Sequence, residues 1–160
     1  MQITATIPGI PPIMIITDFN RKLSEAKEKN MSDYIFGDPF YTSPNGYKLR
    51  MLVSLNATRE KFEDVHLGIY ICVMKSDHDA ILTWPFKKKY TFTLIDQQDN
   101  EKERKNIVGT MTPQGEDEFK RPNEKENEGR GCAKFVSHAT LRTRKYIKDD
   151  TVFITVSIEQ

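Results

Sequence analysis

Two cysteines and three histidines are the side chains of this sequence that could carry nucleophilic, acid–base or metal chemistry. Cys132 follows Gly131 at the start of a predicted strand, and it could act as a nucleophile if a base such as His138 folded against it. A small thiol in an apolar sequence context is far more often a buried residue. A hydrolase or ligand-binding site on Cys132 and His138 stays open as an alternative, which full activity after Cys132→Ser would remove.

The histidines have no partners at the spacing of a metal site, since His66 and Cys72 share only a strand face. Asp77, His78 and Asp79 are neighbours in a polar turn, where adjacent side chains point in different directions. The sequence also has no glycine-rich phosphate loop, no nucleophile elbow and no P-loop lysine. We therefore expect no metal, no cofactor and no enzyme activity.

The overall composition is that of one domain without a strong charge. The chain has 160 residues, with 24 Lys and Arg against 23 Asp and Glu, so its formal charge is +1 and we expect no nucleic acid partner. The apolar stretch 7–16 is interrupted by three prolines and a glycine, and it is too short for a membrane span or a signal peptide. Cys72 and Cys132 are expected to be reduced core thiols of a cytoplasmic protein.

The pattern of apolar residues predicts a protein built mainly of strands. Residues 47–55 alternate between apolar and polar, which indicates a half-exposed strand. Residues 65–74 are almost wholly apolar, which indicates a strand covered on both faces. Further strands are predicted at 90–95 and 151–158, and weaker ones at 131–136, 13–16 and 104–110.

Helical signal is scarce. Residues 21–29 predict one short surface helix, with Asn20 as its cap, and Ser137 could cap a single turn that follows it. The highly charged stretch 96–130 is predicted to be a long exposed excursion with one edge strand, as typical of a solvated loop as of a binding site. Strands separated by turns, without long helices between them, favour an antiparallel sandwich.

Three separated stretches make the sequence recognisable. They are PFYTSPNGYKL at 39–49, DAILTWPF at 79–86 and YIKDDT at 146–151. Together they resemble the TRAF-C (MATH) domain of TNF receptor associated factors. The resemblance runs from about Ile13 to the end, so we expect residues 1–12 to be an N-terminal extension or linker and residues 13–160 to be the domain.

The resemblance implies an all-β antiparallel sandwich of about eight strands with one or two short surface helices. It also implies a non-catalytic, cytoplasmic adaptor that captures extended receptor-tail or adaptor peptides at a sheet-edge groove, downstream of TNF receptors or of interleukin-1 and Toll-like receptors. Family members trimerise through a preceding coiled coil and carry a RING. This sequence contains neither, so we expect a monomer or weak trimer. The alternative is a MATH substrate-recognition module that serves a ubiquitin ligase or protease encoded elsewhere in a longer chain.

The family groove can be carried over by position, and several of its charges are changed. The family's arginine, tyrosine and acidic residue read Leu52, Ser54 and Thr58, while its aromatic residue is kept as Tyr70. Where family members have a run of serines before a phenylalanine, this sequence has Glu116, Asp117, Glu118 and then Phe119. Where they begin the next strand with Ser-Gly or with a glycine between aromatic residues, it has Arg130, Gly131 and Cys132. Because carboxylates repel acidic ligands, the resemblance predicts a peptide motif more basic or apolar than the family norm. The loop at 56–65, the stretch between Gln97 and Lys120, and the sequence LRTRKY at 141–146 resemble the branch that also serves interleukin-1 and Toll-like receptors.

Overall fold

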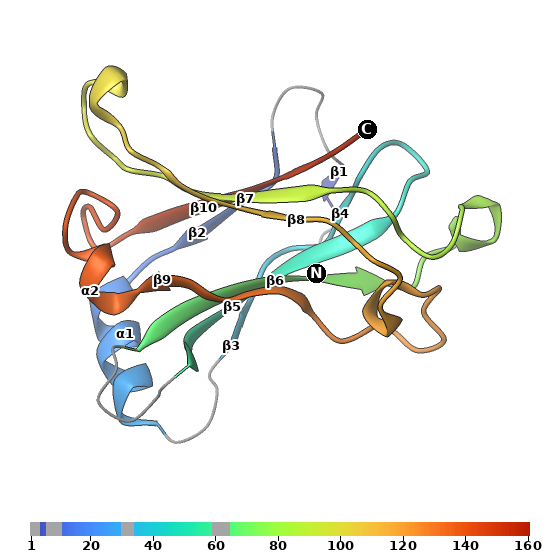
Figure 1. The fold of residues 1–160 in the computed structure, drawn as a ribbon, viewed down its shortest axis with the longest axis horizontal. Helices are drawn as coiled ribbons and strands as arrows, with labels where there is room; N and C mark the ends of the chain where they lie inside the picture. The colour runs from blue at the N-terminus through green and yellow to red at the C-terminus, as the bar shows by residue number, and fades with distance from the viewer. Residues whose placement is uncertain (1–3, 6–10, 30–33, 59–64) are drawn as a thin grey trace.

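The computed structural model describes residues 4–5, 11–29, 34–58 and 65–160, and it folds as two packed β-sheets (Figure 1). The first sheet has the strand order β1-β4-β5-β6-β9, with β3 also paired to β5. Its strands are β1 (Thr4–Ala5), β3 (Tyr34–Phe36), β4 (Phe40–Tyr41), β5 (Lys48–Thr58), β6 (His66–Met74) and β9 (Arg130–Ser137). The second has the order β2-β10-β7-β8, from β2 (Ile13–Ile16), β10 (Val152–Ile158), β7 (Tyr90–Leu94) and β8 (Ile107–Met111).

The predicted all-β sandwich is confirmed, with two differences in detail. The described residues form ten strands rather than about eight. Strands β1 and β4 have only two residues each, which is too short for a strand to be recognised from its sequence pattern. The β1–β4 pair is parallel, whereas every other strand pair is antiparallel. Edge strands β8 and β9 lie side by side at one open side of the sandwich.

The hydrophobic core lies between the sheets and is built from alternate residues of the long strands. Every second residue of a strand points to the same face, so these side chains meet in one layer. They include Leu49, Met51, Val53 and Leu55 of β5, Leu67, Ile69, Ile71 and Val73 of β6, and Val152, Ile154 and Val156 of β10. This inward set is the one that the period-two pattern predicted for β5.

The outer face of β5 differs from the prediction of a half-exposed strand. Arg50, Leu52 and Ser54 point away from the core, yet they are 8%, 9% and 1% exposed. Strand β3 pairs along β5 on one side, and residues 125–127 hydrogen-bond to the end of β6 on the other. Two segments distant in sequence therefore cover a face that looks solvated in the sequence alone.

A cluster of aromatic rings closes one end of the core. Tyr47 packs edge-on against Trp84 and Phe86, with ring centroids 5.1 and 4.9 Å apart. Phe86 is fully buried and lies beside Phe119, which comes from the one-turn 3-10 helix η3 (Asp117–Phe119). The Trp-Pro-Phe motif at 84–86 is thus an element of packing.

Helices α1 (Phe19–Glu28) and α2 (His138–Leu141) lie at the same end of the sandwich (Figure 1). Helix α1 starts one residue before the predicted cap Asn20, because Asp150, far along the chain, accepts the amide protons of both Phe19 and Asn20. Asp150 follows Asp149 in a tight turn in which both residues are left-handed. The predicted cap of α2 is confirmed, since Ser137 Oγ accepts the amide proton of Thr140 at 3.0 Å.

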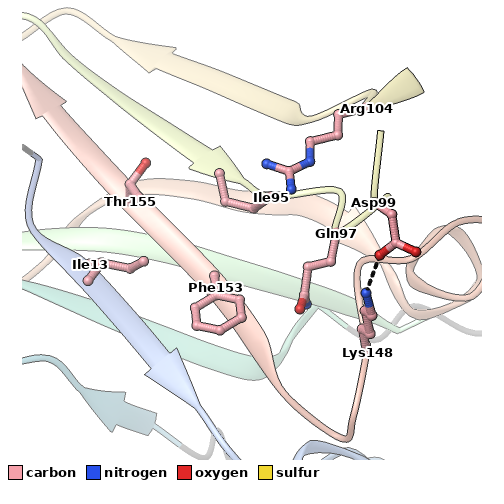
Figure 2. A pocket seen from close by; sticks show the side chains of 8 residues that line it. All are labelled: Ile13, Ile95, Gln97, Asp99, Arg104, Lys148, Phe153 and Thr155. Atoms are coloured by element: carbon pink, nitrogen blue, oxygen red, sulfur yellow. Dashed lines mark hydrogen bonds and ion pairs between the residues drawn. The ribbon is translucent and has the colours of Figure 1, made fainter. Parts of the chain in front are cut away.

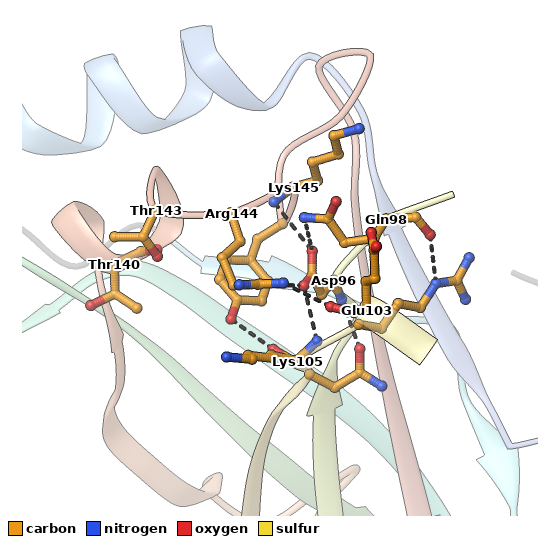
Figure 3. Close-up of polar contacts among 11 residues, drawn as sticks. Asp96, Gln98, Glu103, Lys105, Thr140, Thr143, Arg144 and Lys145 are labelled. Carbon is orange, nitrogen blue, oxygen red and sulfur yellow. Dashed lines mark hydrogen bonds and ion pairs between the residues drawn. The ribbon is translucent and has the colours of Figure 1, made fainter. Parts of the chain in front are cut away.

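The stretch 96–130 contains the predicted edge strand, β8. The prediction that this stretch is exposed is wrong at its first residue, Asp96. Asp96 is fully buried, although its surroundings in the sequence indicated a solvated loop. Its carboxylate accepts hydrogen bonds from the Arg144 side chain at 2.7 Å and from the amides of Lys105 and Lys145 at 2.9 and 3.2 Å (Figure 3). Burial acts to raise the pKa of Asp96, but the bonds from Arg144, Lys105 and Gln98 outweigh it and hold the pKa below its ordinary value.

The structure has two further one-turn 3-10 helices among the described residues, η1 (Asp79–Ile81) and η2 (Glu101–Glu103). In η1 the Asp79 carboxylate accepts the amide proton of Ser76 at 2.9 Å, which confirms the predicted polar turn. Within the part of the chain that is described, no helix has the length and apolarity needed to cross a membrane.

Candidate functional site

A groove of about 580 Å3 crosses the outer face of the six-stranded sheet. Leu52 of β5 and Tyr70 of β6 are paired in register on its floor, and Cys72 follows Tyr70 on the same face. Strand β3 supplies one wall through Tyr34 and Phe36, which are 48% and 51% exposed. The opposite wall is residues 126–129, the end of the loop that leads into β9.

The backbone of that loop lies directly on the groove floor. A Cβ atom on Gly129 would stand 3.1 Å from Tyr70 Cβ and 3.3 Å from Leu52 Cδ2. Asn127 anchors the same loop, because its side-chain amide donates to the carbonyl oxygens of Glu118 and Lys120. The groove wall is therefore tied both to the sheet and to η3.

A buried ion pair lies beside the groove. Arg50, on the same face of β5 as Leu52, donates from Nε to Glu126 Oε2 at 2.9 Å and from its second terminal nitrogen to Oε1. The Arg50 guanidinium also stacks over Phe36, with 4.2 Å from its central carbon to the ring centroid. One arginine thus contacts both walls of the groove.

The groove floor is uncharged near neutral pH. Burial, with a smaller contribution from Glu126, raises the pKa of the Cys72 thiol to about 12. Burial also raises the pKa of Tyr70, and Tyr34 and Cys132 raise it further. Both groups are consequently protonated, and the floor presents an apolar and aromatic surface.

A second hollow of about 290 Å3 continues from the groove and is acidic. The two share Glu126, Asn127 and Glu128. The further lining residues are Asp117, Glu118, Lys120, Asn123 and Glu124. Glu118 also forms an exposed ion pair with Arg130 at 3.1 Å. The five carboxylates face one lining lysine, so this end of the surface is favourable to cations.

Six of the predicted site residues lie around the groove and the acidic hollow. Leu52 and Tyr70 line the groove, while Asp117 and Glu118 line the adjoining hollow. Gly131 pairs directly with Tyr70 across β6 and β9, and Arg130 lies next to it in β9. The structure therefore gathers these six residues around one surface, and their role in peptide binding stays a prediction.

The other predicted site residues do not offer side chains to the groove. Ser54 is 1% exposed, and Phe119 is 2% exposed and belongs to the core. Cys132 turns toward β8, where its Sγ is 3.5 Å from Met111 Sδ. Glu116 accepts the amide proton of Gln114, and Thr58 pairs with His66 beyond an irregularity in β5, away from Leu52.

Sequence reasoning missed most of the groove walls. Tyr34 and Phe36 form an exposed alternation of only three residues. Residues 126–129 read as an ordinary polar loop, in which no local pattern shows that Glu126 meets Arg50, 76 positions away. Cys72 was expected in the core, and it is indeed buried at 3%, yet it faces outward beneath the groove. Burial here depends on long-range pairing that the sequence pattern does not encode.

The residues of the alternative site on Cys132 and His138 belong to different elements. Cys132 lies near the start of β9, opposite Ile69, whereas His138 is the first residue of α2 and follows Ser137, which pairs with His66 at the other end of the strand. Nε2 of His138 meets the carbonyl oxygen of Leu55, and burial raises the pKa of Cys132. Nothing in this arrangement activates the thiol. Among the described residues, no three His, Cys, Asp or Glu side chains are grouped to hold a metal.

The outer face of the four-stranded sheet has a hollow of its own, about 550 Å3 in volume (Figure 2). Its floor consists of the apolar residues Ile13, Ile95 and Phe153, and its rim includes Arg104 and the ion pair Lys148–Asp99, 2.7 Å long. No pattern in the sequence had indicated this hollow.

Comparison with known proteins identifies relatives that cover most of this chain. A family model described as TRAF/meprin, MATH domain matches residues 32–155. Mouse TNF receptor-associated factor 5 is 38% identical over 147 residues, which are 90% of this chain and 25% of that protein. Human TNF receptor-associated factor 2 is 33% identical over 146 residues, which are 90% of this chain and 28% of that protein.

A solved structure, Notothenia coriiceps TRAF5, superposes with a TM-score of 0.80 at 30% identity and covers 92% of this chain and 72% of that one. The chain spans about a quarter of the length of the curated relatives that it matches. Xenopus TNF receptor-associated factor 6-A is only 26% identical. The resemblance to the interleukin-1 and Toll-like receptor branch stays a prediction, because overall identity does not test which receptors a domain serves.

Proposed function

This chain belongs to the TRAF/meprin MATH domain family, and from that membership we propose that it is a non-catalytic adaptor domain that binds an extended peptide in the groove on the six-stranded sheet. The partners would be receptor cytoplasmic tails or signalling adaptors. Its relatives are named for association with TNF receptors. We place the domain in the cytoplasm and downstream of that receptor class.

One observation carries the proposal. The uncharged pair Leu52 and Tyr70 lies at the floor of a groove whose aromatic wall, Tyr34 and Phe36, is half exposed. Exposed aromatic rings beside an apolar floor are typical of protein-binding surfaces. Tyr70 of the groove floor also pairs with Gly131 of β9, a strand that has β6 as its one partner strand among the described residues. An unpaired strand edge can supply backbone hydrogen bonds to an extended peptide, while the groove receives its side chains.

The charges around the groove favour a particular peptide chemistry. An apolar or aromatic side chain would fit the floor between Tyr34 and Tyr70. A basic residue beside it would face Glu118 and its acidic neighbours. We therefore propose a preference for basic or neutral peptides over acidic ones.

Tyr34→Ala is expected to weaken peptide binding about tenfold or more, because an aromatic wall residue is removed from the contact surface. The measurement is fluorescence anisotropy against the peptides retained from an immobilised library of receptor-tail and adaptor sequences. Val108→Ala is the matched control, since Val108 is 58% exposed and lies on the other sheet. Equal effects of the two changes would argue against the groove.

The charge preference is tested by Glu118→Ser in the same assay. Loss of this carboxylate is expected to reduce the advantage of basic peptides over their neutral counterparts about threefold, because the contact is partly exposed. Strongest binding of the wild-type domain to acidic peptides, unaffected by Glu118→Ser, would contradict the preference.

The isolated chain is expected to be a monomer or weak trimer whose peptide binding depends on avidity. Fusion to a trimeric coiled coil should raise apparent affinity for an immobilised peptide about 100-fold without a change in intrinsic affinity. Light scattering that showed a tight trimer of the unfused chain at low concentration would contradict this. If even the fused trimer bound no peptide, a substrate-presenting role in a longer protein would replace the adaptor function.

A further inference from the structure

Arg50 is a buried cation beside the groove whose partner comes from the groove wall. Its side chain is 9% exposed, and Glu126 holds it through both carboxylate oxygens. A guanidinium in such a place needs a carboxylate, because an unpaired buried charge is strongly unfavourable. The bidentate geometry satisfies the planar fork of arginine on the side that faces Glu126.

Glu126 lies between this cation and the groove. Arg50 is absent from the groove lining, whereas Phe36 and Glu126, the two residues that contact its guanidinium, both line it. The side chain of Glu126 is 23% exposed, more than twice the exposed fraction of Arg50. A ligand in the groove therefore meets the carboxylate first and reaches the guanidinium only if that carboxylate is displaced.

We propose that Glu126 is the specificity-determining residue of the groove, an internal carboxylate that occupies the position from which an acidic ligand side chain would reach Arg50. This inference rests on the proposed function and goes further, because it assigns the rejection of acidic peptides to one ion pair rather than to the exposed acidic rim. Removal of Glu126 would leave a buried guanidinium without its partner. A ligand carboxylate would then bind in its place.

The first test is chemical rescue with acetate. Glu126→Ala should lower the thermal midpoint of the domain, and 100 mM sodium acetate should restore at least about 2 °C of it relative to sodium chloride of equal ionic strength. Acetate should not stabilise the wild type or the double variant Arg50→Met/Glu126→Ala. Acetate without effect on Glu126→Ala, or with the same effect on the double variant, overturns the inference.

The second test uses pairs of library-selected peptides that differ only by Glu or Gln at one position. The preference for the Glu peptide should rise about tenfold in Glu126→Ala and fall back in the double variant. Asp99→Ala is the matched control, since it frees Lys148 from an exposed ion pair outside this groove and should leave the ratio unchanged. Glu126→Gln, which keeps the side-chain size, provides the same comparison if the alanine variant does not fold.

Different results would contradict the role of Glu126 and the proposed function. Peptide binding with an unchanged ratio of Glu to Gln affinity overturns the role of Glu126 and leaves the groove intact as a binding site. Absence of all peptide binding, with acetate rescue preserved, overturns the proposed function and supports the internal carboxylate in front of Arg50.

Discussion

Asp96→Ala is expected to lower the free energy of unfolding by about 3 kcal/mol, a large fraction of the stability of a domain of this size. The carboxylate is fully buried and joins three segments of the chain: the end of β7, the loop at Lys105 and the loop at Arg144. Its removal would leave the amides of Lys105 and Lys145 without their acceptor. Arg144 would lose its ion pair as well, although it would keep its bond to the carbonyl oxygen of Glu103.

Urea unfolding of the wild type and the variant provides the measurement. Asp99→Ala is the matched control, because Asp99 belongs to the same loop but its ion pair with Lys148 is exposed. We expect no measurable change for that variant. If the two alanine variants had the same unfolding midpoint, Asp96 would not have the structural role inferred from its contacts.

The same residue predicts a pH dependence whose sign follows from its lowered pKa. The stabilising contribution of ionised Asp96 is present above the pKa of the unfolded chain, about 3.9, and is lost as the pH falls through the lower pKa of the folded state. The stability difference between wild type and Asp96→Asn should therefore shrink as the pH falls below about 4. A difference that stayed constant from pH 6 to pH 2 would contradict this.

Gly131→Val is expected to destabilise the domain by about 3 kcal/mol or more and to abolish peptide binding. A Cβ atom at this position would overlap the carbonyl oxygen of Ile69 and stand 2.7 Å from Tyr70 Cα, both backbone atoms of β6 that cannot move aside as a side chain can. Strand β9 would have to separate from β6 beside the groove floor. Fold and site depend here on the same close approach.

Gly129→Ala is the control for this prediction. Its added methyl group would meet side-chain atoms of Tyr70 and Leu52 at 3.1 and 3.3 Å, so the cost in stability is expected to stay below about 1 kcal/mol. Thermal unfolding of the two variants and peptide anisotropy would measure both effects. A Gly131→Val variant as stable as Gly129→Ala would show that the strand pairing at Gly131 is not restrictive.

Local signals predicted most of the strands. The period-two pattern of β5 assigned its inward residues, and the apolar run of β6 indicated a strand covered on both faces; both assignments are confirmed. The start of α1 was misjudged by two residues, since the helix begins at Phe19 and not at Arg21. The reason is that its first amide groups bond to Asp150, 130 positions from Asn20. Local propensity contains no information about such a partner.

For the candidate site, the sequence by itself determined the family, the strand that carries Leu52 and the strand that carries Tyr70. These follow from short motifs and from side-chain alternation, which are local properties of the chain. Only the tertiary structure decided which side chains surround the groove. The pairing of β3 with β5 brings in Tyr34 and Phe36, and the loop before β9 places Glu126 against Arg50. The physical reason is that burial and charge pairing depend on contacts between segments far apart in sequence, whereas periodicity reports only the face on which a residue lies.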